Sequence, residues 1–173
     1  FIGMGLSLSF AFILTTRINA ENKLFRIYEN KMYLKSESQV QGYVSKIDNK
    51  GEEFFMGGLS LIKNGYVNEG FQYLQIGFER SGKPSLGRVL ANGLLKQKKY
   101  AQAEKIYRYN KNVEPYRYEA RMDLLSFFIE TKQEAKAKAM AQEIIKLPVK
   151  VASPTIEGHK RKAKQYLQGF EPK

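Results

Sequence analysis

The fold of this chain is decided by residues 84–117, PSLGRVLANGLLKQKKYAQAEKIYRYNKNVEPYR, together with residues 118–148, YEARMDLLSFFIETKQEAKAKAMAQEIIKLP. Aligning Ala103 with Ala137 also places Leu90 over Leu124 and Leu94 over Phe128. In each copy an apolar helical stretch is followed by a short polar turn and by a second helical stretch with a small residue facing the first. The pattern therefore predicts two successive helix pairs.

A further copy precedes these two, because Gly70 stands at almost the same spacing before Ala103 as Ala103 does before Ala137. A unit of about 34 residues is the tetratricopeptide period, in which each helix pair must stack on a neighbour to bury its apolar face. We therefore expect an all-α fold in which about three tetratricopeptide-like helix pairs occupy residues 50–150 and capping helices flank them; the alternative is a helical bundle that shares this spacing by chance. The expected repeat-packing residues are Gly70, Leu74, Leu90, Leu94, Ala103, Tyr107, Leu124, Phe128, Ala137 and Ala141.

Composition excludes several kinds of site. The 173 residues include no cysteine and one histidine, His159, so disulfides, thiolate metal sites and the usual histidine-based metal clusters and catalytic triads are absent. The 29 Lys and Arg outnumber the 17 Asp and Glu, which gives a net charge of +12. Such a chain favours anionic partners, whether lipid headgroups, nucleic acid or acidic protein, and the sign of the charge does not choose among them.

Residues 1–16, FIGMGLSLSFAFILTT, carry no charged side chain. They would make about 24 Å of helix, which is short of the roughly 30 Å hydrocarbon core, so we read them as the C-terminal part of a longer transmembrane helix. A signal-peptide core and a buried helix are the alternatives; the first lacks a good cleavage site, and the second is disfavoured by a stretch that is apolar all round.

Residues 17–49 are expected to form a juxtamembrane stalk and a capping helix. Several Lys and Arg follow the apolar segment, and the positive-inside rule then places the soluble part on the cytoplasmic side of the inner membrane. At the other end, Pro148 and Pro154 interrupt the helical pattern. Residues 151–173 should hold a last capping helix from about Thr155 to Gln168, capped by Ser153 or Thr155, and a basic tail that could touch anionic lipid.

No stretch of the chain carries a convincing catalytic pattern. Residues 77–83, GFERSGK, resemble part of a phosphate-binding loop, but Pro84 stands where Ser or Thr would hold magnesium, and an ordinary turn between repeats suffices. Glu119 and Asp123 lie four residues apart with Arg117 and Arg121 nearby, which is typical of a solvated charged stripe on a helix. Four tyrosines at positions 107, 109, 116 and 118 are expected to pack between helices in preference to stacking on bases, so nucleic-acid binding and cofactors are not expected.

Three runs carry a resemblance to a family: 114–125 (EPYRYEARMDLL), 136–145 (KAKAMAQEII) and 148–155 (PVKVASPT). Together with the preceding apolar segment, they resemble the tetratricopeptide-like C-terminal region of Bacteroidetes-type O-antigen ligase and polymerase-like membrane proteins. The resemblance implies a parent protein that transfers a polysaccharide from a lipid carrier to an acceptor during lipopolysaccharide biosynthesis, with its active site upstream of Phe1. No catalytic residue is therefore implied for this chain.

Two interpretations of the function follow. In the first, the chain is a non-catalytic, membrane-tethered helical-repeat domain of such a protein and serves protein–protein interaction. In the second, it is an independent single-anchor adaptor that binds a partner protein or peptide in its concave groove. A stand-alone soluble enzyme is the least favoured interpretation. The sequence leaves the partner, its binding surface and the oligomeric state open.

Overall fold

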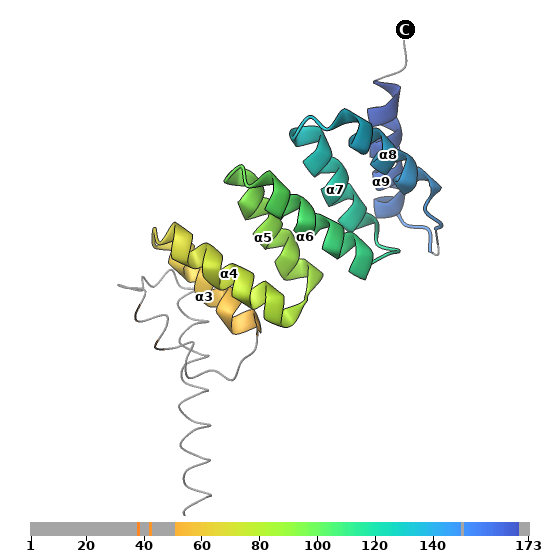
Figure 1. Ribbon diagram of the computed structural model, residues 1–173. Coiled ribbons are helices and arrows are strands. Elements are labelled where there is room, and N and C mark those ends of the chain that lie inside the picture. The colour runs from red at the N-terminus through yellow and green to blue at the C-terminus, as the bar shows by residue number, and fades with distance from the viewer. Residues whose placement is uncertain (1–37, 39–41, 43–50, 150, 170–173) are drawn as a thin grey trace, which may run out of the picture. The chain divides into compact units, whose positions relative to one another are not determined.

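The computed structural model describes Ser38, Gly42 and residues 51–149 and 151–169 of the chain. These residues form helices joined by turns, without a strand among them, as the repeat pattern predicts (Figure 1). The helices are α3 (Gly51–Lys63), α4 (Val67–Ser81), α5 (Pro84–Lys96), α6 (Tyr100–Val113), α7 (Tyr118–Glu130), α8 (Glu134–Lys146) and α9 (Pro154–Gln168). The expected all-helical architecture is confirmed.

The predictions for the N-terminal part fall outside the described residues. These are the transmembrane segment at 1–16 and, apart from Ser38 and Gly42, the stalk and capping helix at 17–49. Ser38 and Gly42 are both helical and exposed. Among the residues that the structure describes, none of the helices has the length and apolar character needed to cross a bilayer.

Three helix pairs follow one another at the predicted spacing. The first helices, α3, α5 and α7, begin at residues 51, 84 and 118, and the second helices, α4, α6 and α8, begin at residues 67, 100 and 134. The chain divides into two compact units, residues 1–86 and 87–173, with the boundary inside α5. The repeat unit and the compact unit therefore have different boundaries.

The turn inside each helix pair has the same backbone geometry in all three copies. Gly65, Lys98 and Lys132 occupy equivalent positions and have φ values of 91°, 60° and 58°. The next residue in each copy donates its N–H to the carbonyl five positions earlier, at 3.0, 2.9 and 2.8 Å (Tyr66 to Leu61, Lys99 to Leu94, Gln133 to Phe128). These bonds and the left-handed residue define a Schellman motif, which ends the first helix and aims the second back along it.

Glycines bring α3 and α4 into backbone contact in the first unit. A Cβ on Gly70 would lie 2.5 Å from Ile62 Cγ1 and 2.8 Å from the Gly58 carbonyl oxygen. A Cβ on Gly77 would lie 2.6 Å from both the Gly51 carbonyl oxygen and the Phe55 nitrogen. Gly70, which replaces the alanine of the later copies, is therefore required by the close approach of the two helices.

The core of the second unit is built around α7, which packs against α6, α8 and α9 (Figure 1). Leu124, Phe127 and Phe128 of this helix are almost completely buried. The Phe127 ring lies 5.4 Å from the ring of Tyr107 on α6 and 5.6 Å from that of Phe128, at tilted to perpendicular angles. Aromatic side chains therefore form much of the core of this unit.

Helix α9 covers one end of the second unit. Ser153 caps it, because its side-chain oxygen accepts a hydrogen bond from the Ile156 N–H at 3.2 Å, and Pro154 occupies the first turn. Ala163 is fully buried, and α9 packs on α8 and α7. The expected terminal helix is present, and of the two residues that could cap it the structure uses Ser153.

The segment that resembles a phosphate-binding loop is the end of α4. Its first residues are helical, and Gly82 has φ 61° and donates its N–H to the Phe78 carbonyl at 2.8 Å. Lys83 forms an ion pair with Glu52 of α3. The interpretation of this segment as an ordinary turn between repeats is confirmed.

Candidate interaction surface

The first helices of the last two pairs, α5 and α7, expose apolar and hydrogen-bonding side chains together. Val89 and Ile129 are 42% and 44% exposed, and Asn92 and Ser126, which occupy equivalent positions of successive repeats, are also exposed. We call these four residues the α5–α7 face. A mixture of exposed apolar groups and hydrogen-bonding groups is characteristic of surfaces that bind proteins.

A buried tyrosine orients Asn92. The Tyr107 hydroxyl on α6 donates a hydrogen bond to Asn92 Oδ1 at 2.5 Å. Burial raises the pKa of Tyr107 to about 12, and the negative charges of Asp123 and Glu130 act in the same direction, while Arg88 opposes them. The hydroxyl therefore keeps its proton at neutral pH, and the amide nitrogen of Asn92 retains its capacity to donate to a ligand.

An ion pair joins α5 to α7 beside this amide. Arg88 Nε lies 2.5 Å from Asp123 Oδ2, and the side chains of both residues are partly exposed. Burial raises the pKa of Asp123, and the hydrogen bond from Arg88 offsets this only in part. The pair links the two helices that carry the α5–α7 face.

The expected solvated stripe on α7 is wrong for Arg121 and only partly right for Asp123. The Arg121 side chain is only 8% exposed; its Nε donates to Glu143 Oε1 of α8 at 2.9 Å, and its Nη1 donates to the Arg117 carbonyl at 3.3 Å. Asp123 points toward α5, as described above, whereas Glu119 is more exposed. The repeat alignment indicates the inward position of Arg121, because this residue aligns with the buried Gly87 of the preceding copy.

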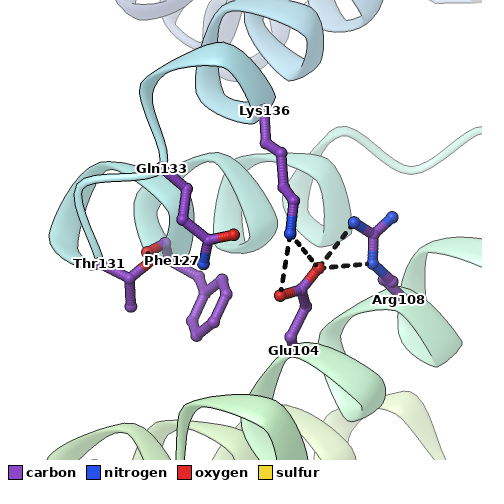
Figure 2. Close-up of polar contacts among 6 residues, drawn as sticks. All are labelled: Glu104, Arg108, Phe127, Thr131, Gln133 and Lys136. Atoms are coloured by element: carbon purple, nitrogen blue, oxygen red, sulfur yellow. Dashed lines mark hydrogen bonds and ion pairs between the residues drawn. The ribbon is translucent and has the colours of Figure 1, made fainter.

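The second helices, α6 and α8, are joined by two ion-pair networks. In the first, the Glu104 carboxylate of α6 accepts hydrogen bonds from Arg108 of the same helix at 2.7 and 2.9 Å and from Lys136 of α8 at 3.2 Å (Figure 2). Both cations also lie 5.5 Å from the centre of the Phe128 ring. In the second network, Lys111 of α6 joins the Arg121–Glu143 pair at 3.3 Å.

These networks direct charges of α6 and α8 toward each other. Burial alone would raise the pKa of Glu104, but the hydrogen bonds and positive charges of Arg108 and Lys136 outweigh it, so the pKa lies below its ordinary value. Figure 2 also shows Thr131 and Gln133 at the end of α7, where Gln133 donates to the Thr131 hydroxyl and Thr131 donates to the Phe127 carbonyl. We interpret these contacts as structural, because they join helices or close a turn.

The residues predicted to pack in the repeats all lie in the interior. Each of the ten expected positions is buried, including Asn92's partner Tyr107 and the glycine at position 70. The tyrosine prediction holds only in part. Tyr107 and Tyr118 are buried, whereas Tyr109 and Tyr116 are 40% and 61% exposed.

His159 lies at the contact of α9 with α7. Its ring stacks on that of Tyr118 at a centroid distance of 6.3 Å, and its Nε2 is 4.0 Å from Glu119 Oε1. The Tyr118 hydroxyl donates to the Leu147 carbonyl at 2.8 Å. Within the described part of the chain, no group of three or more His, Asp or Glu side chains is arranged to hold a metal ion.

No protein-family model matches the sequence, and no curated protein matches it. Among solved structures, the chain is similar to one chain in the structure of Naa15/Naa10 bound to HypK-THB, with a TM-score of 0.54 and 19% sequence identity. The alignment covers 91% of this chain but only 26% of that chain. At this identity the likeness concerns the fold alone, and it agrees with the helical-repeat architecture seen in the described residues.

Proposed function

We propose that this chain is a non-catalytic interaction domain that binds a segment of a partner protein on its α5–α7 face. The observation that carries the proposal is the Tyr107–Asn92 hydrogen bond, which holds a polar amide on an exposed helix face next to Val89. An amide that is already oriented loses less conformational entropy on binding than a free one.

The helical-repeat architecture supports this proposal. Stacked helix pairs create extended surfaces on which partner segments bind. The similar solved chain belongs to an assembly, Naa15/Naa10 bound to HypK-THB. The α6 and α8 helices are less suited to the role, because Glu104 and Glu143 already bind the cations around them.

Site-specific photo-cross-linking tests the choice of surface. A photoreactive amino acid at Asn92 or Ser126 should cross-link a discrete protein in cells that make the full-length protein. The same group at Tyr109 or Lys138, on α6 and α8, should give much less of that product. Cross-links that arise mainly from Tyr109 or Lys138 would show that the partner binds α6 and α8, which would contradict the proposal.

The binding chemistry can then be measured with the identified partner. Asn92→Ala removes the oriented amide, and we expect a loss of affinity of about tenfold, which corresponds to one hydrogen bond with an oriented group. Tyr107→Phe should have a smaller effect in the same direction, because the Asn92 amide remains but is no longer held in one orientation. Lys138→Ala serves as a surface control and should leave the affinity unchanged.

We further propose that the domain belongs to the C-terminal region of an O-antigen ligase-like membrane protein, at the cytoplasmic side of the inner membrane. The order of an uncharged segment at 1–16, helix pairs and the run 148–155 supports this assignment. An independent single-anchor adaptor is the alternative. The gene decides between them: many apolar spans upstream of Phe1 would support the ligase-like parent, and a start codon immediately before it would contradict that parent.

A topology reporter tests the side of the membrane. Alkaline phosphatase fused after Lys173 in the complete protein should be inactive if the domain is cytoplasmic, whereas green fluorescent protein at the same position should fluoresce. The reverse pattern would place the domain on the opposite side. Neither result would change the assignment of the α5–α7 face, which depends on contacts within residues 87–169.

A further inference from the structure

The positive charge of the chain is concentrated in its second unit. Residues 87–169 contain 18 Lys or Arg and 8 Asp or Glu, whereas residues 51–86 contain 3 and 4. Five of the eight carboxylates form ion pairs with Lys or Arg within the unit, at positions 104, 114, 123, 134 and 143, and Glu119 lies 4.0 Å from His159 Nε2. The acidic side chains are thus largely occupied, and the surplus consists of cations.

Helix α9 holds the densest group of these surplus cations. Lys160, Arg161, Lys162 and Lys164 lie close together in the sequence, and Glu157 is the one acidic residue on the helix. None of the four is part of an ion pair within the described residues. Because Ala163 packs inward, Arg161, Lys162 and Lys164 are exposed to solvent.

Exposed apolar side chains lie in the segment that leads into this helix. Val149 and Val151 are 37% and 74% exposed, and Val151 is more exposed than the other large apolar residues of the described chain. Cations that attract acidic headgroups, next to apolar side chains that enter the interfacial region, are the combination that binds an anionic membrane surface. Single-stranded nucleic acid would instead stack on exposed aromatic rings, and the exposed Tyr109 and Tyr116 lie outside α9 and the segment before it.

We propose that Val149, Val151 and the four cations of α9, which we call the basic cap, bind an anionic phospholipid bilayer. The uncharged segment at 1–16 fits this occupant, because a tether in the same membrane would keep the basic cap close to the headgroups. The proposal concerns a different surface from the α5–α7 face and does not depend on it. Electrostatic attraction would supply most of the binding, so the contact should weaken as salt is raised.

A fluorescent probe can test this proposal on the complete chain, because the sequence contains no cysteine. Val151→Cys is labelled with an environment-sensitive dye and mixed with vesicles of phosphatidylcholine alone or of phosphatidylcholine with phosphatidylglycerol at 7:3. We expect a blue shift with the anionic vesicles and its reversal in concentrated potassium chloride. A probe at Ser126→Cys, which is remote from the basic cap in sequence and lies on α7, should not respond.

The charge requirement is tested by a matched pair of variants. Replacing the four α9 cations with glutamate should weaken binding to the anionic vesicles by about tenfold or more, since each cation near such a surface contributes to binding. The control replaces Lys96, Lys98, Lys99 and Lys105 with glutamate, which changes the net charge equally, and should retain the blue shift. Circular dichroism establishes that both variants keep their helices.

Four results would overturn the proposal. These are no shift with either vesicle, an equal shift with both, equal loss of the shift in the two variants, and a shift of the same size with polyglutamate in place of vesicles. The last would assign the basic cap to an acidic protein. Because the probe reports the surroundings of residue 151, insertion of residues 1–16 into the vesicle does not by itself produce the expected pattern.

Discussion

The first helix pair and the two later pairs have the same turn but are held together differently. In α3 and α4, glycines at 51, 58, 70 and 77 bring the two backbones into contact. In α5 to α8, alanine and aromatic side chains are buried at the helix contacts. The Arg88–Asp123 and Lys136–Glu104 pairs join one repeat to the next, and Arg121–Glu143 joins the two helices of one pair. The Schellman turn is common to all three pairs, whereas the residues at the helix contacts determine how closely each pair packs and which substitutions destabilise it.

Gly77→Ala should have the largest effect, because it adds a side chain where the two backbones of the first pair meet. All three nearest atoms to the added Cβ belong to the backbone of α3, so no side-chain rotation can relieve the overlap. We expect a loss of about 3 kcal/mol in the stability of the first helix pair, at the upper end of overpacking effects. Urea unfolding combined with hydrogen exchange of the α3 and α4 amides measures it.

Gly158→Ala is the matched control for this substitution. Gly158 lies within α9, and an added Cβ would meet no atom within 4 Å. Alanine should therefore stabilise the chain by up to about 1 kcal/mol, through helix propensity alone. Equal effects of the two substitutions would show that α3 and α4 do not depend on close backbone approach.

Arg121→Met tests the ion pairs of the later repeats. Methionine keeps most of the volume but removes the hydrogen bonds to Glu143 and to the Arg117 carbonyl. We expect a loss of about 2 kcal/mol, which is typical of a buried hydrogen bond to a charged group. Arg108→Met, which removes a more exposed pair with Glu104, should cost about 0.5 kcal/mol in the same urea titration. A smaller effect at Arg121 than at Arg108 would contradict the structural role of the buried pair.

The role of the shared turn can be tested by introducing glycine, which the first repeat has at position 65, into the two later repeats. Lys98 and Lys132 adopt a left-handed conformation that is strained for any residue with a Cβ, and Gly65 does so without strain. Lys98→Gly and Lys132→Gly should each raise the melting temperature, with a gain of about 1 kcal/mol in stability. Lys105→Gly, in the middle of α6, should lower stability by about 1 kcal/mol and serves as the control. A loss of stability at all three positions would mean that the lysine side chains support the turn.

The smallest expected effect is the pH dependence of the α6–α8 contact. The pKa of Glu104 is lowered from 4.5, so the ionised form is favoured by folding and its contribution is present above that pH. The contribution is lost as the pH falls through the folded pKa. The pKa of Asp123 is raised, so its contribution to folding stability changes in the opposite direction. As the pH rises, ionisation of Asp123 is less favourable in the folded chain than in the unfolded one, and this lowers the stability of the fold. Carboxyl titration by NMR should place Glu104 below 4.5 and Asp123 above 3.8; the reverse order of shifts would contradict both environments.

The sequence predicted the helix pairs well because their spacing depends on local rules. Small residues recur at 70, 103 and 137, and apolar residues recur at 61, 94 and 128, so the register follows without knowledge of the packing. The glycines of the first copy, among them Gly70, are compatible with close backbone approach, but the atoms that meet there depend on how α3 lies against α4. The burial of Arg121 differs from the expected solvated position. Charged residues are usually exposed, although the alignment of Arg121 with the buried Gly87 indicates an inward position.

The candidate interaction surface was less accessible to sequence reasoning. The Tyr107–Asn92 bond joins residues 15 positions apart, and the Arg88–Asp123 pair joins residues 35 apart. Neither spacing is a motif by itself, because both depend on how adjacent helices lie against each other. The sequence also predicts that Tyr109 and Tyr116 pack between helices, because they occur at helical spacing together with Tyr107 and Tyr118. The structure leaves Tyr109 and Tyr116 exposed.

Hydrogen–deuterium exchange in the presence of the purified cross-linking partner shows which helices that partner covers. If the partner binds the α5–α7 face, the amides of α5 and α7 should exchange more slowly in its presence, while those of α6 and α8 should be little affected. Asn92→Ala should reduce this protection at a fixed partner concentration. Protection confined to α6 and α8, or absent from residues 87–130, would contradict the assignment of this face as the binding surface.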